Sequence, residues 1–293
     1  MNLKETLKEV GFRVFALSFN LAALLPVKQD RVVFFNLMHG APTGALKEVE
    51  KELRRADQAA AHRLEYQPPQ YVFVDRQALE QGVRSMLRFM TVDAFRMGRA
   101  RWLFLNNNFF PFGWVRPNKD TVLVQLWHGQ GAFKKFNFDI PQPEHIRKKE
   151  VGASKPISFV TCSAENIRPI YISAFGLPAE KVLTTGNPVS DYFFRPENVS
   201  PDAAAKKREA FNAHYPVCKD KYLVFYAPTF RDDEAEDKAL LNHLDPEALL
   251  KAAEKGTGKE AVLLIRLHPN DSRGREALNS LSERFSHVLD LTD

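Results

Sequence analysis

The chain begins with a helical pattern of apolar residues. Apolar side chains recur in alternating steps of four and three residues, at Leu3, Leu7, Val10, Val14, Leu17, Leu21 and Leu24. Such spacing places these side chains in one stripe along an α-helix. We expect Phe12, Phe15 and Phe19 to widen the stripe, and Pro26 to end the helix. Residues 1–30 are therefore predicted to form an amphipathic segment.

This first helix is predicted to lie on a membrane surface. The uncharged run 14–27 is shorter than the ~20 residues that a membrane-spanning helix needs, and residues 24–28 offer no small-residue cleavage site for a signal peptide. An amphipathic helix at the membrane–water interface is the favoured interpretation of residues 1–27. Packing of the helix on its own domain or on a partner protein is the alternative.

From residue 31 onward, strands alternate with helices. Runs of β-branched and aromatic residues predict six strands, at 31–38, 71–75, 101–107, 121–127, 157–163 and 181–188. Helical patterns lie between them, at 45–56, up to about residue 99, and at 167–176 with Gly176 as the stop. This alternation predicts an α/β fold with a mostly parallel, doubly wound sheet in a domain of residues 31–194.

A second α/β domain is predicted for residues 195–293. A basic helix at 203–212 leads into strand segments within 221–233, 261–270 and 287–291, with helices at 246–255 and 275–285. Three strands are fewer than the five or six of a complete doubly wound domain. We therefore expect this domain to be incomplete and to continue beyond Asp293.

Composition changes this picture in three respects. The hydrophobic fraction of 44% with 26% charged residues indicates a globular protein with a real core, and 23 phenylalanines leave some large rings for a membrane surface. Much of the basic excess behind the net charge of +5 lies before residue 156, which suits anionic lipid, a polyanionic substrate or nucleic acid. No zinc-finger spacing, RRM-type strand or long basic helix accompanies it, so a nucleic-acid partner is not expected. Cys162 and Cys218 fit neither a disulfide framework nor a metal site, which favours a reducing cytosol.

Polar residues gather where predicted strands end, which is where open α/β sheets bind ligands. Four such sets are His128, Gly129, Gly131, Lys134 and Lys135; Gly186, Asn187 and Asp191; Thr229, Arg231, Asp232 and Asp233; and Arg266, His268, Pro269 and Asn270. Each set alone has a structural explanation, because tight turns need glycine, lysines favour solvent, and proline ends a strand. Together they suit a phosphate-rich substrate, with amides at the start of a helix after Gly131, cations for charge and histidine for proton transfer. Two histidine loops from two units predict an inter-domain cleft.

Two further segments carry less weight. His39, at the exit of the first strand, is a weaker candidate for the same cleft. The segment Arg231-Asp232-Asp233-Glu234 resembles an acidic metal site, but Glu236 and Asp237 extend it into a run that more simply faces solvent. The chain has no nucleophilic serine or cysteine motif, no Walker loop and no zinc spacing.

Three segments resemble motifs of the CDP-glycerol:poly(glycerophosphate) glycerophosphotransferases, the teichoic acid polymerase and primase family. They are QLWHGQGAFKKF at 125–136, YAPTFRDD at 226–233 and LLIRLHPN at 263–270. The resemblance covers roughly residues 30–293 and has two departures. Residues 186–191 read GNPVSD where members often carry Gly-x-Pro-Arg-x-Asp. The family's later Thr-Asp-Tyr-Ser-Ser-like segment would lie beyond the last residue, so part of the donor site is expected to be missing.

The resemblance implies a GT-B fold, in which two Rossmann-like domains face a cleft and the second domain holds the nucleotide donor. It implies transfer of a polyol phosphate from CDP-glycerol or CDP-ribitol to a hydroxyl of a lipid-linked or polymeric acceptor, in the synthesis of a teichoic-acid-like or capsule polymer. His128 would be the general base. His268, Arg266 and Arg231 would stabilise the CMP leaving group.

The same resemblance assigns the remaining candidates to binding. Donor contacts would come from Thr229, Pro269 and Asn270, and acceptor or phosphate contacts from Gly129, Gly131, Lys134 and Lys135. The scheme requires no cofactor and leaves a divalent metal open. It implies a peripheral enzyme on the cytoplasmic face of the cell membrane. Two alternatives stay open, a GT-B sugar transferase that uses a nucleotide sugar and a non-catalytic protein that binds only acceptor or membrane.

Overall fold

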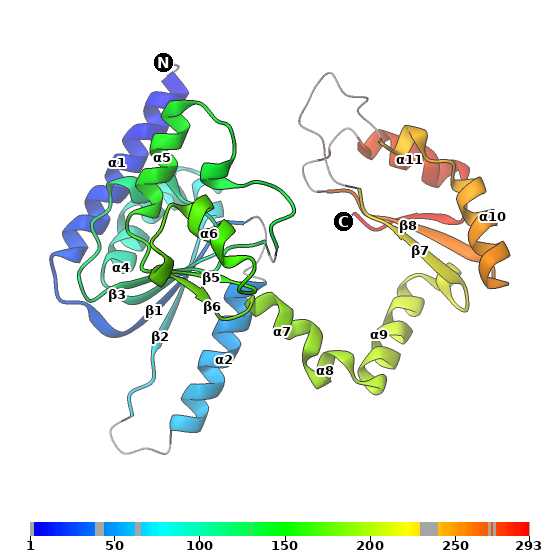
Figure 1. The fold of residues 1–293 in the computed structure, drawn as a ribbon, viewed down its shortest axis with the longest axis horizontal. Helices are drawn as coiled ribbons and strands as arrows, with labels where there is room; N and C mark the ends of the chain where they lie inside the picture. The colour runs from blue at the N-terminus through cyan, green and yellow to red at the C-terminus, as the bar shows by residue number, and fades with distance from the viewer. Residues whose placement is uncertain are drawn as a thin grey trace. The chain divides into compact units, whose positions relative to one another are not determined.

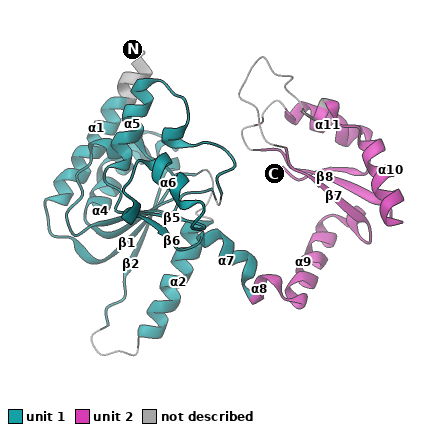
Figure 2. Cartoon of the chain, in the orientation of Figure 1, with its two compact units in different colours: residues 1–195 teal, residues 196–293 magenta. Residues whose placement is uncertain are grey.

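The structure is a computed structural model that describes residues 3–38, 44–61, 66–129, 131–228, 240–268, 271 and 274–292. The chain divides into two compact units, residues 1–195 and 196–293 (Figures 1 and 2). The first helix, predicted as a segment of its own, belongs to unit 1.

Unit 1 is built on one parallel sheet with the strand order β2-β1-β3-β4-β5-β6. Its strands are β1 (Lys28–Asn36), β2 (Gln70–Asp75), β3 (Ala100–Leu105), β4 (Val122–Gln125), β5 (Phe159–Cys162) and β6 (Val182–Thr184). All six predicted strands are present, and the prediction of a doubly wound α/β fold is confirmed. The direction of strand addition reverses between β1 and β3. Ligands of such sheets bind beside the reversal, outside the carboxyl ends of the strands.

The connections in unit 1 are helices and short helical turns. They are α1 (Leu3–Ala23), α2 (Ala45–Ala60), η1 (Arg76–Leu79), α3 (Val83–Arg88), the π-helical turn η2 (Phe89–Asp93), α4 (Ala94–Gly98), η3 (Phe110–Trp114), η4 (Asn137–Asp139), α5 (Glu144–Ser154), α6 (Arg168–Phe175), η5 (Ala179–Lys181) and α7 (Pro188–Phe194). α6 ends as predicted at Gly176, whose φ is +60°. A Cβ there would lie 2.3 Å from the Phe138 ring, so only glycine fits.

Alternate residues of the strands enter two separate cores, as the two faces of a sheet require. Val33 and Phe35 of β1 face the larger core, which α1, α4 and α6 cover. Phe34 faces the other side, where α2 packs. Its ring stacks on Phe73 of β2 at 5.2 Å and on Phe104 of β3 at 5.5 Å. These cross-strand ring contacts stabilise the register of the three strands at the reversal.

α1 is attached to unit 1 by its phenylalanine side. Phe15 and Phe19 are buried in the larger core, and the Phe15 ring stacks on Phe89 at 5.5 Å. Gly98 of α4 permits close approach of the two helices, because a Cβ there would lie 2.3 Å from the Phe19 carbonyl oxygen. At about 100° per residue, Phe15 and Phe19 point roughly 140–180° away from Val10. The prediction that the phenylalanines widen the apolar stripe is therefore wrong, since they form the opposite side of the helix.

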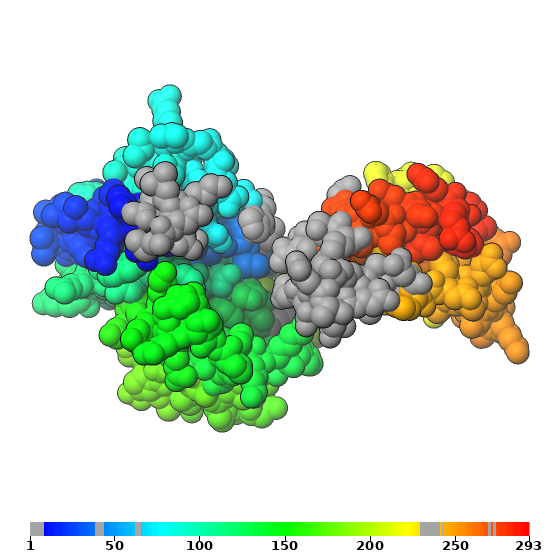
Figure 3. Space-filling view, turned by 90° about the horizontal axis from the view of Figure 1, so that it is seen from above, coloured from blue at the N-terminus to red at the C-terminus, as the bar shows by residue number. Residues whose placement is uncertain are grey.

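The other side of α1 is an apolar stripe that unit 1 leaves exposed. Val10, Val14, Leu17, Leu21 and Leu24 are between 36% and 81% exposed, and we call these residues the α1 stripe. α1, dark blue in Figure 3, lies at the surface of unit 1. Within the part of the chain that the structure describes, no helix has the length and apolar character needed to cross a membrane.

Unit 2 contains a parallel sheet of three strands in the order β7-β8-β9. Its elements are α8 (Pro196–Val199), α9 (Pro201–His214), η6 (Pro216–Cys218), β7 (Tyr222–Tyr226), η7 (Leu240–His243), α10 (Pro246–Thr257), β8 (Ala261–Ile265), α11 (Gly274–Arg284) and β9 (Val288–Asp290). Every residue of β8 is buried. Leu263 and Ile265 pack with Leu278 and Leu281 of α11, whereas Val262 and its neighbours pack on the side of α9. The three strands predicted for this segment are confirmed.

Candidate active site

The loop after β4 begins with an unusual backbone conformation. Trp127 has a φ of +59°, which is rare for a bulky residue and costs on the order of 1–3 kcal/mol. Packing compensates for this cost, because the indole is 6% exposed and contacts the rings of Phe136 at 5.4 Å and Phe175 at 5.2 Å. The left-handed turn at Trp127 sets the direction in which His128 leaves the strand.

The imidazole of His128 is oriented by a backbone carbonyl. Its Nδ1 lies 3.3 Å from the Asn106 carbonyl oxygen, and its ring lies 4.2 Å from the Trp127 ring. Because a carbonyl only accepts, Nδ1 carries the proton and Nε2 keeps a lone pair. The residue keeps access to solvent. Burial of the ring lowers the pKa of His128 below its usual value, although the bond to Asn106 acts in the opposite direction. A neutral imidazole with a free acceptor nitrogen is the form that a general base requires.

Buried amides tie together the strand ends beneath His128. Asn106 donates from Nδ2 to Asn36 Oδ1 at 2.8 Å, and its Oδ1 accepts from Leu37 N at 2.8 Å. Gln125, fully buried at the end of β4, donates from Nε2 to Asn107 O at 2.9 Å and accepts from Trp127 N at 3.0 Å. These contacts join the carboxyl ends of β1, β3 and β4, which include the sheet reversal.

This amide network was not among the features predicted from the sequence. Its signals were a glutamine inside the apolar run 122–127 and the asparagines that follow the 101–107 strand. A polar side chain at a position that the strand pattern requires to be buried indicates a hydrogen-bond network, because unpaired buried amides are costly.

Gly129 is held by two side chains from other elements. Its carbonyl oxygen accepts from the Tyr171 hydroxyl at 2.8 Å and from Asn187 Nδ2 at 3.3 Å. Burial raises the pKa of Tyr171 to about 12, so the hydroxyl remains a donor. Asn187 also caps α7, since its Oδ1 accepts from Val189 N at 3.0 Å. The structure thus brings together the first two predicted sets, the His128 loop and the loop at Gly186 and Asn187, whereas Asp191 is an exposed residue of α7.

The residues after Gly131 differ from the prediction. No helix begins there, and residues 131–136 form an irregular, bent segment before η4. The physical reason is Phe136, whose ring packs among Trp127, Tyr171 and Phe175 and draws the chain back to the core. The predicted amide donors of a helix start are therefore not available at this point. Lys134 and Lys135 are exposed and follow the His128 loop directly.

Unit 2 places Arg266 and His268 at the carboxyl end of β8. Arg266 N donates to Tyr226 O at 3.1 Å, which extends the pairing with β7. Leu267 is buried at 3% exposure, while Arg266 is exposed and His268 is half-buried. The His268 carbonyl oxygen accepts from Asp271 N at 2.8 Å. Leu267 therefore anchors the segment in the core and leaves its two polar neighbours at the surface of the unit.

Several candidates lie outside the described residues. They are His39, Thr229, Arg231, Asp232, Asp233, Pro269 and Asn270. Their roles stay predictions. Among the residues that the structure does describe, no group of three or more His, Cys, Asp or Glu side chains is arranged to hold a metal ion.

The fold places the chain in a known class of proteins. A solved structure of the wall teichoic acid polymerase TagF matches 99% of this chain and 68% of its own length, with a TM-score of 0.66 and 18% identity. UDP-GlcNAc 2-epimerase from Neisseria meningitidis matches 90% of this chain and 72% of its own length, with a TM-score of 0.52 and 12% identity. These likenesses define the chain as a GT-B-like α/β protein.

Within that class, the chain belongs to the CDP-Glycerol:Poly(glycerophosphate) glycerophosphotransferase family, whose sequence profile matches residues 17–293. The family inferred from three motifs is thereby confirmed, and its members are transferases. The chain is 28% identical to the teichoic acid ribitol-phosphate primase of Bacillus spizizenii over 99% of its length and 71% of that protein. It is 25% identical to the teichoic acid ribitol-phosphate polymerase TarK of Staphylococcus aureus over 96% of its length and 51% of that protein.

Proposed function

We propose that this protein transfers a polyol phosphate from CDP-glycerol or CDP-ribitol to a hydroxyl of a lipid-linked or polymeric acceptor in teichoic-acid-like polymer synthesis. Family membership supports the reaction class. Similar proteins include ribitol-phosphate and glycerol-phosphate primases, and a TagF variant has been solved after a soak with CDPG. The observation that carries the proposal is the His128 imidazole, fixed through Nδ1 with Nε2 left to accept a proton.

In the proposed reaction, the acceptor hydroxyl oxygen attacks the phosphorus that bears the polyol. A new bond forms between this oxygen and the phosphorus, while the bond from the phosphorus to the bridging diphosphate oxygen breaks. CMP leaves with the bridging oxygen, and His128 Nε2 takes the hydroxyl proton. Proton transfer by a positioned histidine typically contributes about 10²–10⁴-fold to the rate.

Negative charge develops on CMP as the bond breaks. Cationic or proton-donating groups placed at the donor diphosphate stabilise that charge. We assign this role to Arg266 and His268, which follow one buried strand, and to Arg231, which comes after β7 in the sequence. Lys134 and Lys135 add positive charge next to the His128 loop, which suits a polyanionic acceptor.

The test of His128 is CMP release from CDP-glycerol and from CDP-ribitol in the presence of an acceptor. We expect His128→Ala to lower kcat by about 10²-fold or more. His145→Ala is the matched control, because His145 is an exposed residue of α5. Near-normal CMP release by His128→Ala would remove this residue from the mechanism, and release of UDP or GDP from nucleotide sugars in place of CMP would refute the reaction itself.

The same assay tests the unit 2 motif. We expect His268→Ala and Arg266→Gln to lower CMP release, with His287→Ala, an exposed position before β9, as the control. An unchanged rate in both site variants would exclude the motif from the donor site.

We further propose that the protein is peripheral on the cytoplasmic face of the membrane, with the α1 stripe in contact with lipid. Five exposed apolar side chains in one line suit an interfacial helix. The buried phenylalanine side of α1 keeps this line in a fixed orientation. Leu17→Gln/Leu21→Gln is expected to weaken sedimentation with lipid vesicles, and Ile170→Gln/Leu183→Gln, which changes exposed apolar residues elsewhere on unit 1, is expected to leave it unchanged. Equal binding of all proteins would refute this part of the proposal.

A further inference from the structure

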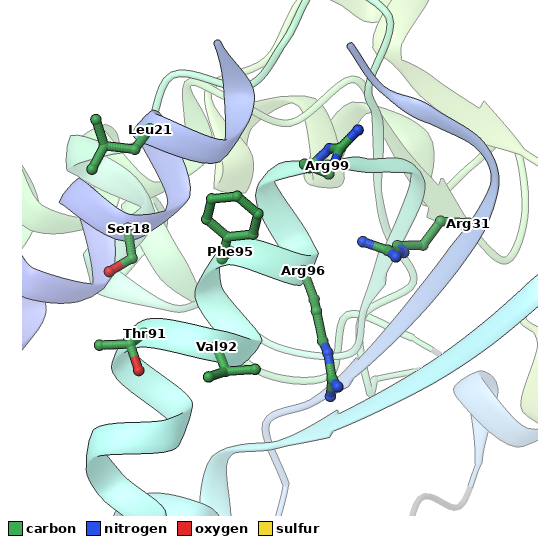
Figure 4. A pocket seen from close by; sticks show the side chains of 8 residues that line it. All are labelled: Ser18, Leu21, Arg31, Thr91, Val92, Phe95, Arg96 and Arg99. Atoms are coloured by element: carbon green, nitrogen blue, oxygen red, sulfur yellow. The ribbon is translucent and has the colours of Figure 1, made fainter. Parts of the chain in front are cut away.

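A pocket of about 480 Å³ lies between α1, β1 and the η2–α4 segment. Its lining combines apolar, hydroxyl and guanidinium groups, namely Ser18, Leu21, Arg31, Thr91, Val92, Phe95, Arg96 and Arg99 (Figure 4). Leu21 and Phe95 lie on the α1 side of the view, and Arg31 and Arg99 lie on the opposite side. The pocket therefore has an apolar side and a cationic side.

Three guanidinium groups share the cationic side. Arg31 comes from β1, Arg96 from α4, and Arg99 follows the end of α4. Burial and the neighbouring charges of Arg99 and Arg96 lower the pKa of Arg31, while Asp30 acts in the opposite direction. Arg31 Nε is buried and has no hydrogen-bond partner among the described residues. Because the three arginines line one pocket and the charges of Arg96 and Arg99 act on Arg31, an anion in the pocket would be stabilised.

The carboxylates around the pocket offset only part of this charge. Asp93 Oδ1 accepts from Arg96 at 3.3 Å, and its Oδ2 lies 3.8 Å from Arg88 Nε. Asp93 is thus shared between two arginines. Arg99 donates to the Pro26 carbonyl oxygen at 3.1 and 3.3 Å, a neutral acceptor that leaves its charge uncompensated. The planar guanidinium groups suit the oxygens of a phosphate, which accept such donors in pairs.

The apolar side of the pocket continues into the α1 stripe. Leu21 belongs to both, and Val92 and Phe95 beside it are 46% and 38% exposed. A ligand that fits this combination carries an anionic group for the arginines and an apolar part for the exposed side chains. A membrane lipid has both parts, and its phosphate lies at the depth of an interfacial helix.

We propose that the pocket formed by Arg31, Arg96 and Arg99 binds the phosphate of an anionic membrane phospholipid beside the α1 stripe. This inference rests on the proposed membrane association and adds a specific headgroup site to it. The headgroup site selects anionic lipid, whereas the α1 stripe provides apolar contact with any lipid. Thr91 Oγ1 donates to the Leu87 carbonyl oxygen at 2.7 Å, so its hydroxyl proton is already used and the three arginines remain the donors of the headgroup site.

The test uses the full chain and vesicles of phosphatidylcholine with and without phosphatidylglycerol. Arg31→Gln/Arg96→Gln removes two charges of the pocket. Arg99 is left unchanged because its bonds to the Pro26 carbonyl hold the chain after α1. The control Arg55→Gln/Arg208→Gln removes two charges from exposed positions on α2 and α9. The net charge change is the same, so a difference between the two variants reports position and not total charge.

We expect the pocket variant to bind phosphatidylglycerol vesicles at least about tenfold more weakly than wild type, because each arginine near an anionic surface contributes on the order of fivefold. We expect the control to stay within about twofold, and both variants to bind pure phosphatidylcholine like wild type. Equal losses in the two variants would overturn the headgroup site in favour of general charge attraction.

A second arm separates lipid from free phosphate. Calorimetric titration with inorganic phosphate measures binding without a membrane. One result would overturn the lipid assignment in favour of a soluble ligand: wild type binds phosphate, the pocket variant does not, and the vesicle binding of the variant is unchanged. CMP release with a soluble acceptor is measured in parallel for each variant. We expect it to be unchanged, so failure of the headgroup site and failure of the transferase proposal give different results.

Discussion

Gln125→Leu is expected to destabilise unit 1 and displace the His128 loop together. The Gln125 side chain is fully buried and bonds Asn107 O at 2.9 Å and Trp127 N at 3.0 Å. Leucine has a similar volume but leaves both backbone groups without a partner. An orphaned buried polar group costs about 1–3 kcal/mol, and the added apolar burial offsets on the order of 1 kcal/mol. With two such groups, we therefore expect a loss of about 1–5 kcal/mol in the free energy of unfolding.

Tryptophan fluorescence during urea unfolding measures this loss in unit 1 alone. The three tryptophans of the chain, Trp102, Trp114 and Trp127, all belong to unit 1. With a typical urea slope of roughly 2 kcal/mol per molar, the predicted loss lowers the unfolding midpoint by about 0.5–2.5 M. Gln29→Leu is the matched control, since Gln29 is an exposed residue of β1, and its effect should stay within about 0.5 kcal/mol.

The activity of the same variant tests whether the amide network positions His128. Loss of the bond to Trp127 N frees the left-handed turn, so kcat for CMP release is expected to fall about tenfold or more, with a smaller change in KM for the donor. A midpoint shift no larger than that of Gln29→Leu would show that the two hydrogen bonds do not hold the loop. Normal kcat in a clearly destabilised variant would separate the network from catalysis.

Three further predictions follow from the site and the core. The pKa of His128 is lowered from its usual 6.5. We therefore expect kcat/KM to be flat near neutral pH and to fall as pH decreases, through a midpoint below 6.5. A pH–rate profile with a higher midpoint would contradict the role of burial. Below pH 6.5 the unfolded state binds more protons at His128 than the folded state, so the free energy of unfolding falls as pH decreases. His128→Gln should remove this pH dependence of stability in urea titrations. Asn187→Ala removes the bond to the Gly129 carbonyl and the cap of α7, so thermal melting should show a loss of about 1–2 kcal/mol that Asn187→Ser partly restores. Gly98→Ala places a Cβ 2.3 Å from the backbone of α1 and should lower the free energy of unfolding by about 1–3 kcal/mol or more. The control Gly256→Ala has open space around the new Cβ and should be neutral or stabilising in the same melting experiment.

The strands of both units were predictable because β-branched and aromatic runs alternate with helical patterns. The predicted run 121–127 illustrates the limit of that signal, since the strand itself is Val122–Gln125. Residues 126 and 127 continue the apolar pattern but already belong to the loop of the site. Periodicity reports burial, and Trp127 is as buried as a strand residue although its backbone is left-handed.

α1 shows where helical periodicity stops being informative. The sequence contains two apolar lines, one through Val10 and Leu17 and one through Phe15 and Phe19, on opposite sides of the helix. Hydrophobicity alone does not distinguish the side that packs from the side that stays exposed. The partners of the phenylalanine side, such as Phe89, lie far along the chain, and only tertiary contacts select that side.

The site itself was predictable in its reactive residues and not in its supports. His128 and Gly129 stand out because they follow a strand and match a family motif. Asn106 looks like an ordinary polar residue after a strand, and its contact with His128 is made by a backbone carbonyl that any residue could supply. Such support depends on how neighbouring strands are ordered in space, which a local pattern does not encode.

The two apolar sides of α1 have a consequence for synthesis of the protein. The core partners Phe89 and Phe112 follow Phe15 by 74 and 97 residues in the chain. At ribosomal rates of about 5–20 residues per second, roughly 4–20 s pass between emergence of the helix and emergence of these partners. During this interval neither side of α1 has a folded domain to cover it. The nascent chain therefore exposes an aggregation-prone segment early. Binding to a chaperone or to the bilayer surface would cover this segment until its core partners have been synthesised.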